Sequence, residues 1–121
     1  MIGYATVGCN DLERAKSFYD AVLAPLGMGP NFATDRLQSY GVLGQGSLAV
    51  CKPLDEKPAS PGNGAMTALA APSREVVDAV HAAALAGGGA CEGPPGARSE
   101  GFYAAYFRDL DGNKLCAFKM G

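Results

Sequence analysis

The chain has 121 residues, of which 48% are hydrophobic and 18% are charged, and its formal net charge is −2. This length and composition predict one globular domain with its own core and argue against a disordered chain. Lys and Arg do not form a run or a basic patch, so nucleic acids and anionic membranes are poor candidates as partners.

The N-terminal residues 1–4 lack a basic region followed by an apolar stretch, so we expect no signal peptide. The apolar runs are short and broken by Gly and Pro, so we expect no membrane span. No two cysteines form a CxxC pair, which argues against a zinc motif and a disulfide framework. We therefore expect reduced thiols and a cytoplasmic protein. The four cysteines are Cys9, Cys51, Cys91 and Cys116.

The chain opens with a predicted strand over residues 2–8, followed by a predicted helix. Asn10 is the expected N-cap, and Glu13 three residues later would complete a capping box. Apolar residues then recur at helical spacing and predict one buried stripe. Gly27 and Gly29 are expected to end the helix. The stripe consists of Leu12, Ala15, Tyr19, Val22 and Leu26.

Three short strands are predicted after this helix, over residues 28–35, 37–43 and 47–52. Gly44, Gln45 and Gly46 form the expected hairpin turn between the last two. The stretch 53–64 is rich in Pro and Gly and is the best candidate for a linker.

The second half of the chain repeats the order of the first. A strand is predicted over 65–71, and Ser73 is expected to cap a helix that Gly87–Gly89 end. The residues expected on the buried side of this helix are Val76, Val77, Val80, Ala84 and Leu85.

A strand that begins at 90–92 is expected to break at Pro94 and Pro95. Strands are also predicted over 102–108 and 114–119. The segment Asp109–Asn113 joins them, and its Asp-Gly pair is a strong signal of a tight hairpin.

A shift of 62 residues aligns the two halves, so that Glu13 meets Glu75, Leu23 meets Leu85 and Gly27 meets Gly89. We therefore predict an α+β domain of two βαβββ modules in one chain, with a curled mixed sheet around a cleft and helices outside. The first module spans about 1–53, the linker about 54–63 and the second module about 64–121. Together they form a single domain over 1–121.

Two motifs resemble a known family. The segment Asn10–Tyr19 resembles the "DLERAxxFY" opening of the vicinal oxygen chelate superfamily, the glyoxalase/bleomycin-resistance/dioxygenase family. Arg108–Lys114 resembles its closing "RDPDGNK" hairpin. Both lie at the ends of the 62-residue duplication, as in the short bacterial glyoxalase-like members.

The resemblance also implies where metal ligands would stand. Members with metal chemistry hold Zn, Ni, Mn or Fe with His and Glu side chains in the cleft. The corresponding positions in this chain are Tyr4, Met66 and Cys116, and the optional fourth ligand falls at Ala49. The usual ligands are therefore absent, and we expect no metal and no cofactor.

Other residues are candidates for the wall or mouth of the cleft. Tyr40 and Tyr106 are predicted ligand-binding residues, together with the four metal-ligand positions. Alternation along a strand sends neighbours to opposite faces, and the sequence leaves open which face lines the cleft. Basic residues at strand edges could bind a substrate carboxylate: Arg36, Arg98, Arg108 and Lys114.

His81, the single histidine, is predicted on the partly exposed side of its helix, away from catalysis. Asp109, Asp111 and Asn113 lack the twelve-residue pattern of a calcium loop. The sequence therefore names no catalytic residue.

The first functional hypothesis is a metal-free cleft that binds a small organic molecule, as bleomycin-resistance-type members do. The alternative is a lyase, isomerase or dioxygenase of the glyoxalase type. It would use a metal at a shifted site, or Tyr4 or Cys116 without metal. A third reading is a protein that acts only through protein contacts. The resemblance also implies a homodimer, and it leaves open whether modules are exchanged between subunits.

Overall fold

The computed structural model describes residues 1–42 and 44–121. The first module contains β1 (Tyr4–Gly8), α1 (Leu12–Leu23), a 3₁₀ turn (Ala24–Leu26), β2 (Pro30–Ala33), β3 (Leu37–Gly41) and β4 (Ser47–Cys51). The second contains β5 (Thr67–Ala70), α2 (Arg74–Ala86), β6 (Ala90–Ser99), β7 (Phe102–Arg108) and β8 (Lys114–Met120).

Each module forms its own four-stranded mixed sheet, and the strand order is the same in both. The orders are β1-β4-β3-β2 and β5-β8-β7-β6. In each sheet the first strand pairs in parallel with the last, and the other pairs are antiparallel. This topology confirms the predicted pair of βαβββ modules. The two sheets are not closed into a barrel.

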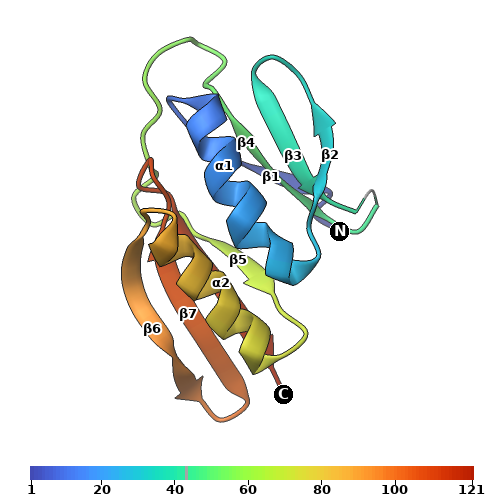
Figure 1. Ribbon diagram of the computed structural model, residues 1–121, viewed down its shortest axis with the longest axis vertical. Helices are drawn as coiled ribbons and strands as arrows, with labels where there is room; N and C mark the ends of the chain where they lie inside the picture. The colour runs from blue at the N-terminus through green and yellow to red at the C-terminus, as the bar shows by residue number, and fades with distance from the viewer. Residues whose placement is uncertain (43) are drawn as a thin grey trace.

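Both helices lie on the same side of the molecule, in front of the sheets in Figure 1, and they contact one another. The core lies between helices and sheets. In β4, Leu48 and Val50 belong to this core, so Ala49 between them points to the other side. In β8, Leu115 and Ala117 belong to the core and Cys116 points away. We call the side of each sheet away from the helices its open face.

Within the part of the chain that the structure describes, no helix is both long enough and apolar enough to cross a membrane.

The N-cap of α1 is Asp11, so the prediction of Asn10 was wrong. The Asp11 carboxylate accepts a hydrogen bond from the backbone N–H of Arg14 at 3.1 Å. Asn10 instead connects loops: its Nδ2 donates to Asp111 Oδ1 at 3.3 Å, and its Oδ1 accepts from the backbone N–H of Ala59 at 2.7 Å. A carboxylate suits the cap because it also complements the helix dipole. In α2 the predicted cap, Ser73, is confirmed.

The helix α1 ends at Leu23, earlier than the apolar stripe predicts. Pro25 follows in a 3₁₀ turn that contains Leu26, and Gly27 closes this turn with a left-handed φ of 72°. The missing N–H of Pro25 removes a helical hydrogen bond, so the chain tightens before it turns. Leu26 still packs against the core.

Strand β6 runs through Pro94 and Pro95, although they were predicted to break it. It is the edge strand of its sheet, where a proline that lacks an N–H can be tolerated. Its pairing with β7 shifts register between Cys91 and Gly93 and between Gly93 and Gly96. These irregularities allow the strand to continue past both prolines.

Several predicted strands are shorter in the structure. β1, β2, β3, β4 and β5 lose residues at their ends, and Leu43, the predicted end of the third strand, lies outside the described residues. In α2, Leu85 is exposed rather than buried. His81 is buried, at 6% exposure, so its predicted position on the partly exposed side was wrong.

A buried hydrogen-bond network joins the two modules. The hydroxyl of Tyr19 on α1 donates to Asp109 Oδ2 in the β7–β8 turn at 2.5 Å. The other Asp109 oxygen accepts from the backbone N–H groups of Asp111 and Asn113. Asn113 Nδ2 donates to Asp109 Oδ2 and to the carbonyl of Gly8 at the end of β1. The turn that the sequence predicts is therefore also the link between the halves.

Candidate functional site

The four positions that correspond to family metal ligands lie two on each module. Tyr4 stands opposite Ser47, and Ala49 stands opposite Thr6, on the open face of the first sheet. Cys116 lies on the open face of the second sheet beside Ala68. Met66 lies just before β5, two residues from Ala68. The pairs are on separate sheets, and strand pairing does not bring the four together.

These positions do not fit a divalent ion. Tyr4 and Met66 are 68% and 47% exposed, and they offer a phenol and a thioether. Ala49 has no donor. Burial raises the pKa of the Cys116 thiol, and Tyr106, Arg98 and Lys114 only partly oppose this effect. Among the described residues no three His, Cys, Asp or Glu side chains form a group that could hold a metal. Hard and borderline ions prefer oxygen and nitrogen ligands.

Tyr40 lies on the helix-facing side of β3. It is fully buried, and its hydroxyl donates to Asp20 Oδ1 on α1 at 2.8 Å. Its register opposite Leu48 explains this position, because directly opposed residues share a sheet face. Burial and this hydrogen bond raise the pKa of Tyr40. Tyr40 is therefore a core residue that ties β3 to α1.

Tyr106 lies on the open face, opposite Cys116 on β8. The structure thus resolves the parity that the sequence left open: Tyr106 and Arg108 face away from the helices, and Tyr103 and Phe107 face them. Of the two additional tyrosine candidates, only Tyr106 belongs to an open face.

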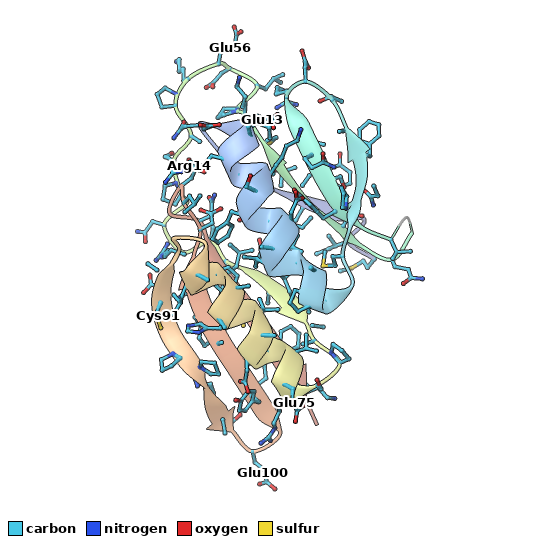
Figure 2. All side chains as sticks on the ribbon, in the orientation of Figure 1. Glu13, Arg14, Glu56, Glu75, Cys91 and Glu100 are labelled. Carbon is cyan, nitrogen blue, oxygen red and sulfur yellow. The ribbon has the colours of Figure 1, made fainter. Side chains whose placement is uncertain are left out.

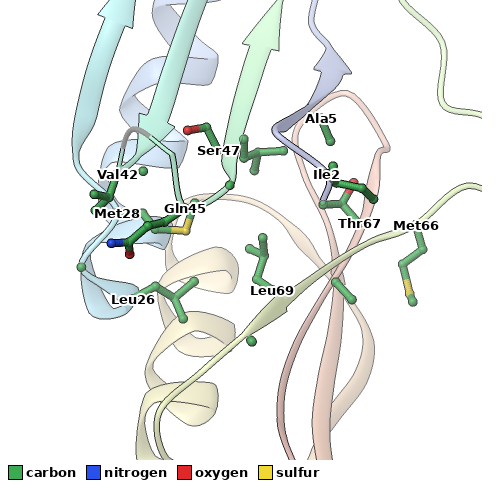
Figure 3. A pocket seen from close by; sticks show the side chains of 16 residues that line it. Ile2, Ala5, Leu26, Met28, Val42, Gln45, Ser47, Met66, Thr67 and Leu69 are labelled. Atoms are coloured by element: carbon green, nitrogen blue, oxygen red, sulfur yellow. The ribbon is translucent and has the colours of Figure 1, made fainter.

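A cavity of about 600 Å³ lies where the two modules meet, and we call it the seam cavity. Figure 3 shows Met28 and Gln45 on one side of it, Thr67 and Met66 on the other, and Leu69 between them. Of the predicted site residues only Met66 lines it. The residues that line it are Ile2, Ala5, Leu26, Gly27, Met28, Gly41, Val42, Gln45, Gly46, Ser47, Leu48 and Met66–Ala70.

A second hollow of about 450 Å³ lies between the end of the linker and the second sheet. We call it the linker hollow, and it is lined by residues 61–66, Arg108 and Lys114. Met66 therefore borders both the linker hollow and the seam cavity. Arg108 forms an ion pair with Glu92 on β6 and donates to the carbonyl of Gly112. Lys114 has no hydrogen-bond or ion-pair partner among the residues that the structure describes.

Two cations lie beside the ring of Tyr106. The Arg98 guanidinium carbon is 5.3 Å from the ring centroid, and Lys114 Nζ is 5.5 Å from it. The sequence identified these residues as separate strand-edge charges and missed their grouping. Arg36, the other predicted basic candidate, lies in the first module and donates to the carbonyl of Lys52.

The structure also pairs His81 with Cys91, which sequence reasoning did not predict. His81 Nε2 lies 3.3 Å from Cys91 Sγ, and Cys91 is exposed on β6 (Figure 2). Burial lowers the pKa of His81, against the opposing effect of Asp78. This pair lies on the helix side of the second sheet, away from both cavities.

Residues 1–117 match the family model of the glyoxalase/bleomycin resistance protein/dioxygenase superfamily. A glyoxalase/bleomycin resistance protein from Albidiferax ferrireducens T118 is 45% identical, with 98% of each chain covered and a TM-score of 0.91. No curated protein matches the sequence.

Two more distant structures share the fold. A glyoxalase-related enzyme from Fulvimarina pelagi is 24% identical, over 98% of this chain and 86% of that one, with a TM-score of 0.76. A glyoxalase/bleomycin resistance protein/dioxygenase family enzyme from Burkholderia phytofirmans PsJN is 16% identical, over 98% of each chain, with a TM-score of 0.77. Because the family model spans almost the whole chain and the Albidiferax protein is similar throughout, this chain belongs to the glyoxalase/bleomycin resistance/dioxygenase superfamily.

Proposed function

We propose that the protein binds a small organic molecule in the seam cavity without a metal ion. The observation that carries this proposal is the cavity itself, about 600 Å³ in volume and lined mainly by apolar side chains from both modules. Only a few polar side chains, such as Gln45, Ser47 and Thr67, interrupt the apolar lining. Size and lining are those of a typical small-molecule site.

The side chains at the family's metal positions support a metal-free site. Met66, which lines the seam cavity, is exposed and suits contact with an organic ligand through its flexible thioether. Cys116 is buried and its pKa is raised, so at neutral pH it is a protonated thiol and a weak nucleophile. These features favour binding over a lyase or isomerase reaction at Tyr4 or Cys116.

Metal content is the first test. The protein, purified without chelator, is expected to contain no stoichiometric metal by elemental mass spectrometry. Titration with Zn²⁺, Ni²⁺, Mn²⁺ and Fe²⁺ is expected to give no tight binding by calorimetry. One tightly bound ion per chain would contradict the proposal and favour a metal-dependent enzyme.

Ligand binding is tested with the neutral apolar probe N-phenyl-1-naphthylamine, whose fluorescence increases in an apolar site. We expect saturable binding to the wild-type protein. Ala5→Phe should weaken it about tenfold or more, because the new ring fills part of the seam cavity. Ala97→Phe is the matched control, since Ala97 is exposed on β6 and does not line this cavity. Equal binding by the two variants would place the probe elsewhere.

A further inference from the structure

The second module carries an organised cationic site on its open face. Arg98 from β6 and Lys114 from β8 approach the same Tyr106 ring, at 5.3 and 5.5 Å from its centroid. The π electrons of this ring attract each of the two cations. Two strands that are not neighbours in the sheet thus each place a positive charge beside the same ring on the strand between them.

Arg98 is held in position although it is exposed. Its Nη1 donates to the carbonyl of Gly96 at 2.9 Å, and its Nη2 donates to the carbonyl of Pro94 at 2.6 Å. A guanidinium has five N–H donors, so three remain available after these two hydrogen bonds. A ligand that binds here therefore does not have to order a freely moving side chain.

Glycines make room for this arrangement. A Cβ atom at Gly93 would lie 3.1 Å from Arg98 Nη2 and 3.0 Å from the Tyr106 ring. A Cβ atom at Gly96 would lie 3.0 Å from Arg98 Nη1. A side chain at either position would force the guanidinium to shift by a few tenths of an ångström. The two glycines of β6, Gly93 and Gly96, thus leave space for the Arg98 guanidinium.

The local charge is positive in a chain whose net charge is −2. Arg98, Arg108 and Lys114 contribute three positive charges, and Glu92, the ion-pair partner of Arg108, contributes one negative charge, which leaves +2. Lys114 also lines the linker hollow, and Met66 borders both that hollow and the seam cavity. The Lys114 end of the positive site therefore meets the apolar cavity at Met66.

We propose that the ligand is an organic acid, whose apolar body occupies the seam cavity and whose carboxylate or sulfonate group is bound by Lys114 and Arg98. This inference rests on the proposed function, because it specifies the class of molecule that the same site takes. Lys114 supplies an ammonium group that has no hydrogen-bond or ion-pair partner among the described residues, and Arg98 supplies its three remaining N–H donors. Charge-assisted hydrogen bonds of this kind are the stronger ones in proteins.

The test compares two fluorescent probes with the same ring system. One is 1-anilinonaphthalene-8-sulfonate, an anion, and the other is neutral N-phenyl-1-naphthylamine. The test variant is the double substitution Arg98→Gln and Lys114→Gln. The control variant, Arg74→Gln with Lys119→Gln, removes the same charges from the second module but from other positions. Arg74 lies over the Tyr103 ring on the helix side, and Lys119 is on β8 with the opposite parity to Lys114.

We expect the test variant to raise the Kd of the anionic probe about tenfold and to leave the Kd of the neutral probe unchanged. The control variant should change neither. An unchanged Kd of the anionic probe in the test variant, or an equal change in the control variant, would overturn the inference. Absence of saturable binding of both probes to the wild type would contradict the proposed function itself.

Discussion

The open faces of the two modules differ in charge although their strands have the same order. The strands of the first module, as the structure describes them, contain no charged residue. Those of the second carry Glu92, Arg98, Arg108 and Lys114 on the open face, and Lys119 with the opposite parity near the end of β8. The helix side of each sheet must remain apolar to form the core. The open face has no such constraint, so one copy of the repeat can carry charges that the other lacks.

The two helices also differ at one equivalent position of the repeat, in the partner that a buried polar side chain contacts. Tyr19 on α1 and His81 on α2 are 62 residues apart, and both are buried. Tyr19 donates across the module boundary to Asp109, whereas His81 contacts Cys91 on the edge strand of its own sheet. The first module therefore depends on the second for a buried polar partner, but the second has its partner within itself. The predictions below test this asymmetry.

Asp109→Ala should have the largest effect. The Asp109 carboxylate is buried and accepts hydrogen bonds from Tyr19, Asn113 and the backbone of its own turn. Its removal leaves these donors without a partner, so the free energy of unfolding should fall by about 3 kcal/mol. Urea denaturation measures this loss. The exposed Asp35→Ala is the control, and a similar small loss in both variants would disprove the role of the network.

Tyr19→Phe should have a smaller effect. It removes one donor from Asp109 and leaves the backbone and Asn113 donors in place. We expect a loss of about 1.5 kcal/mol in the free energy of unfolding. The double variant with Asp109→Ala tests coupling: the two losses should be clearly less than additive. Strict additivity would mean that the two side chains do not act together.

His81 should make the stability of the second module depend on pH. Burial lowers the pKa of His81 in the folded state, so the unfolded chain binds the proton first as the pH falls. This contribution to stability is complete above about pH 6.5 and is lost below it. Between about pH 7.5 and 5.5, the wild type should lose up to about 1 kcal/mol more than His81→Gln. Equal losses in the two proteins would show that His81 does not contribute.

Thiol reactivity should differ among the cysteines without a change in stability. Cys91 is exposed, whereas Cys9 and Cys116 are buried. Burial and the nearby Asp111 raise the pKa of Cys9 to about 11, which keeps this thiol protonated. With an aromatic disulfide reagent, Cys91 should react fastest, and Cys91→Ser should remove this fast phase. A fast phase that persists in the variant would assign it to Cys51.

The sequence predicts the two-module fold because repeated apolar patterns and turn residues are local signals. Ser73 and the Asp109–Asn113 hairpin take their predicted roles. Contacts between distant segments are less visible. The sequence predicts Asn10 as the N-cap, but its side chain forms hydrogen bonds with Ala59 and Asp111. Asp11 caps the helix instead. The sequence predicts Tyr40 as a ligand-binding residue of the cleft. Its register opposite Leu48 instead places it on the side of the sheet that faces α1.

The cationic site around Tyr106 was only partly predictable, because it also depends on contacts between distant segments. Alternation separates Tyr106 from Tyr103 but does not say which face is open, because both faces of β7 carry aromatic residues. The position of Arg98 depends on the irregular pairing of β6, which no local pattern reveals. The seam cavity depends on how the modules meet, so it could not be predicted from either module alone.

The prolines in β6 also affect how the protein behaves at high concentration. An edge strand exposes unpaired backbone groups to which a strand from another chain can be added, and this is how many sheet proteins form fibrils. Pro94 and Pro95 offer no N–H to such a strand, and the register shifts around them interrupt the straight edge. The outer edge of the second sheet is therefore a poor template for intermolecular growth, because of the same two residues that were predicted to end the strand.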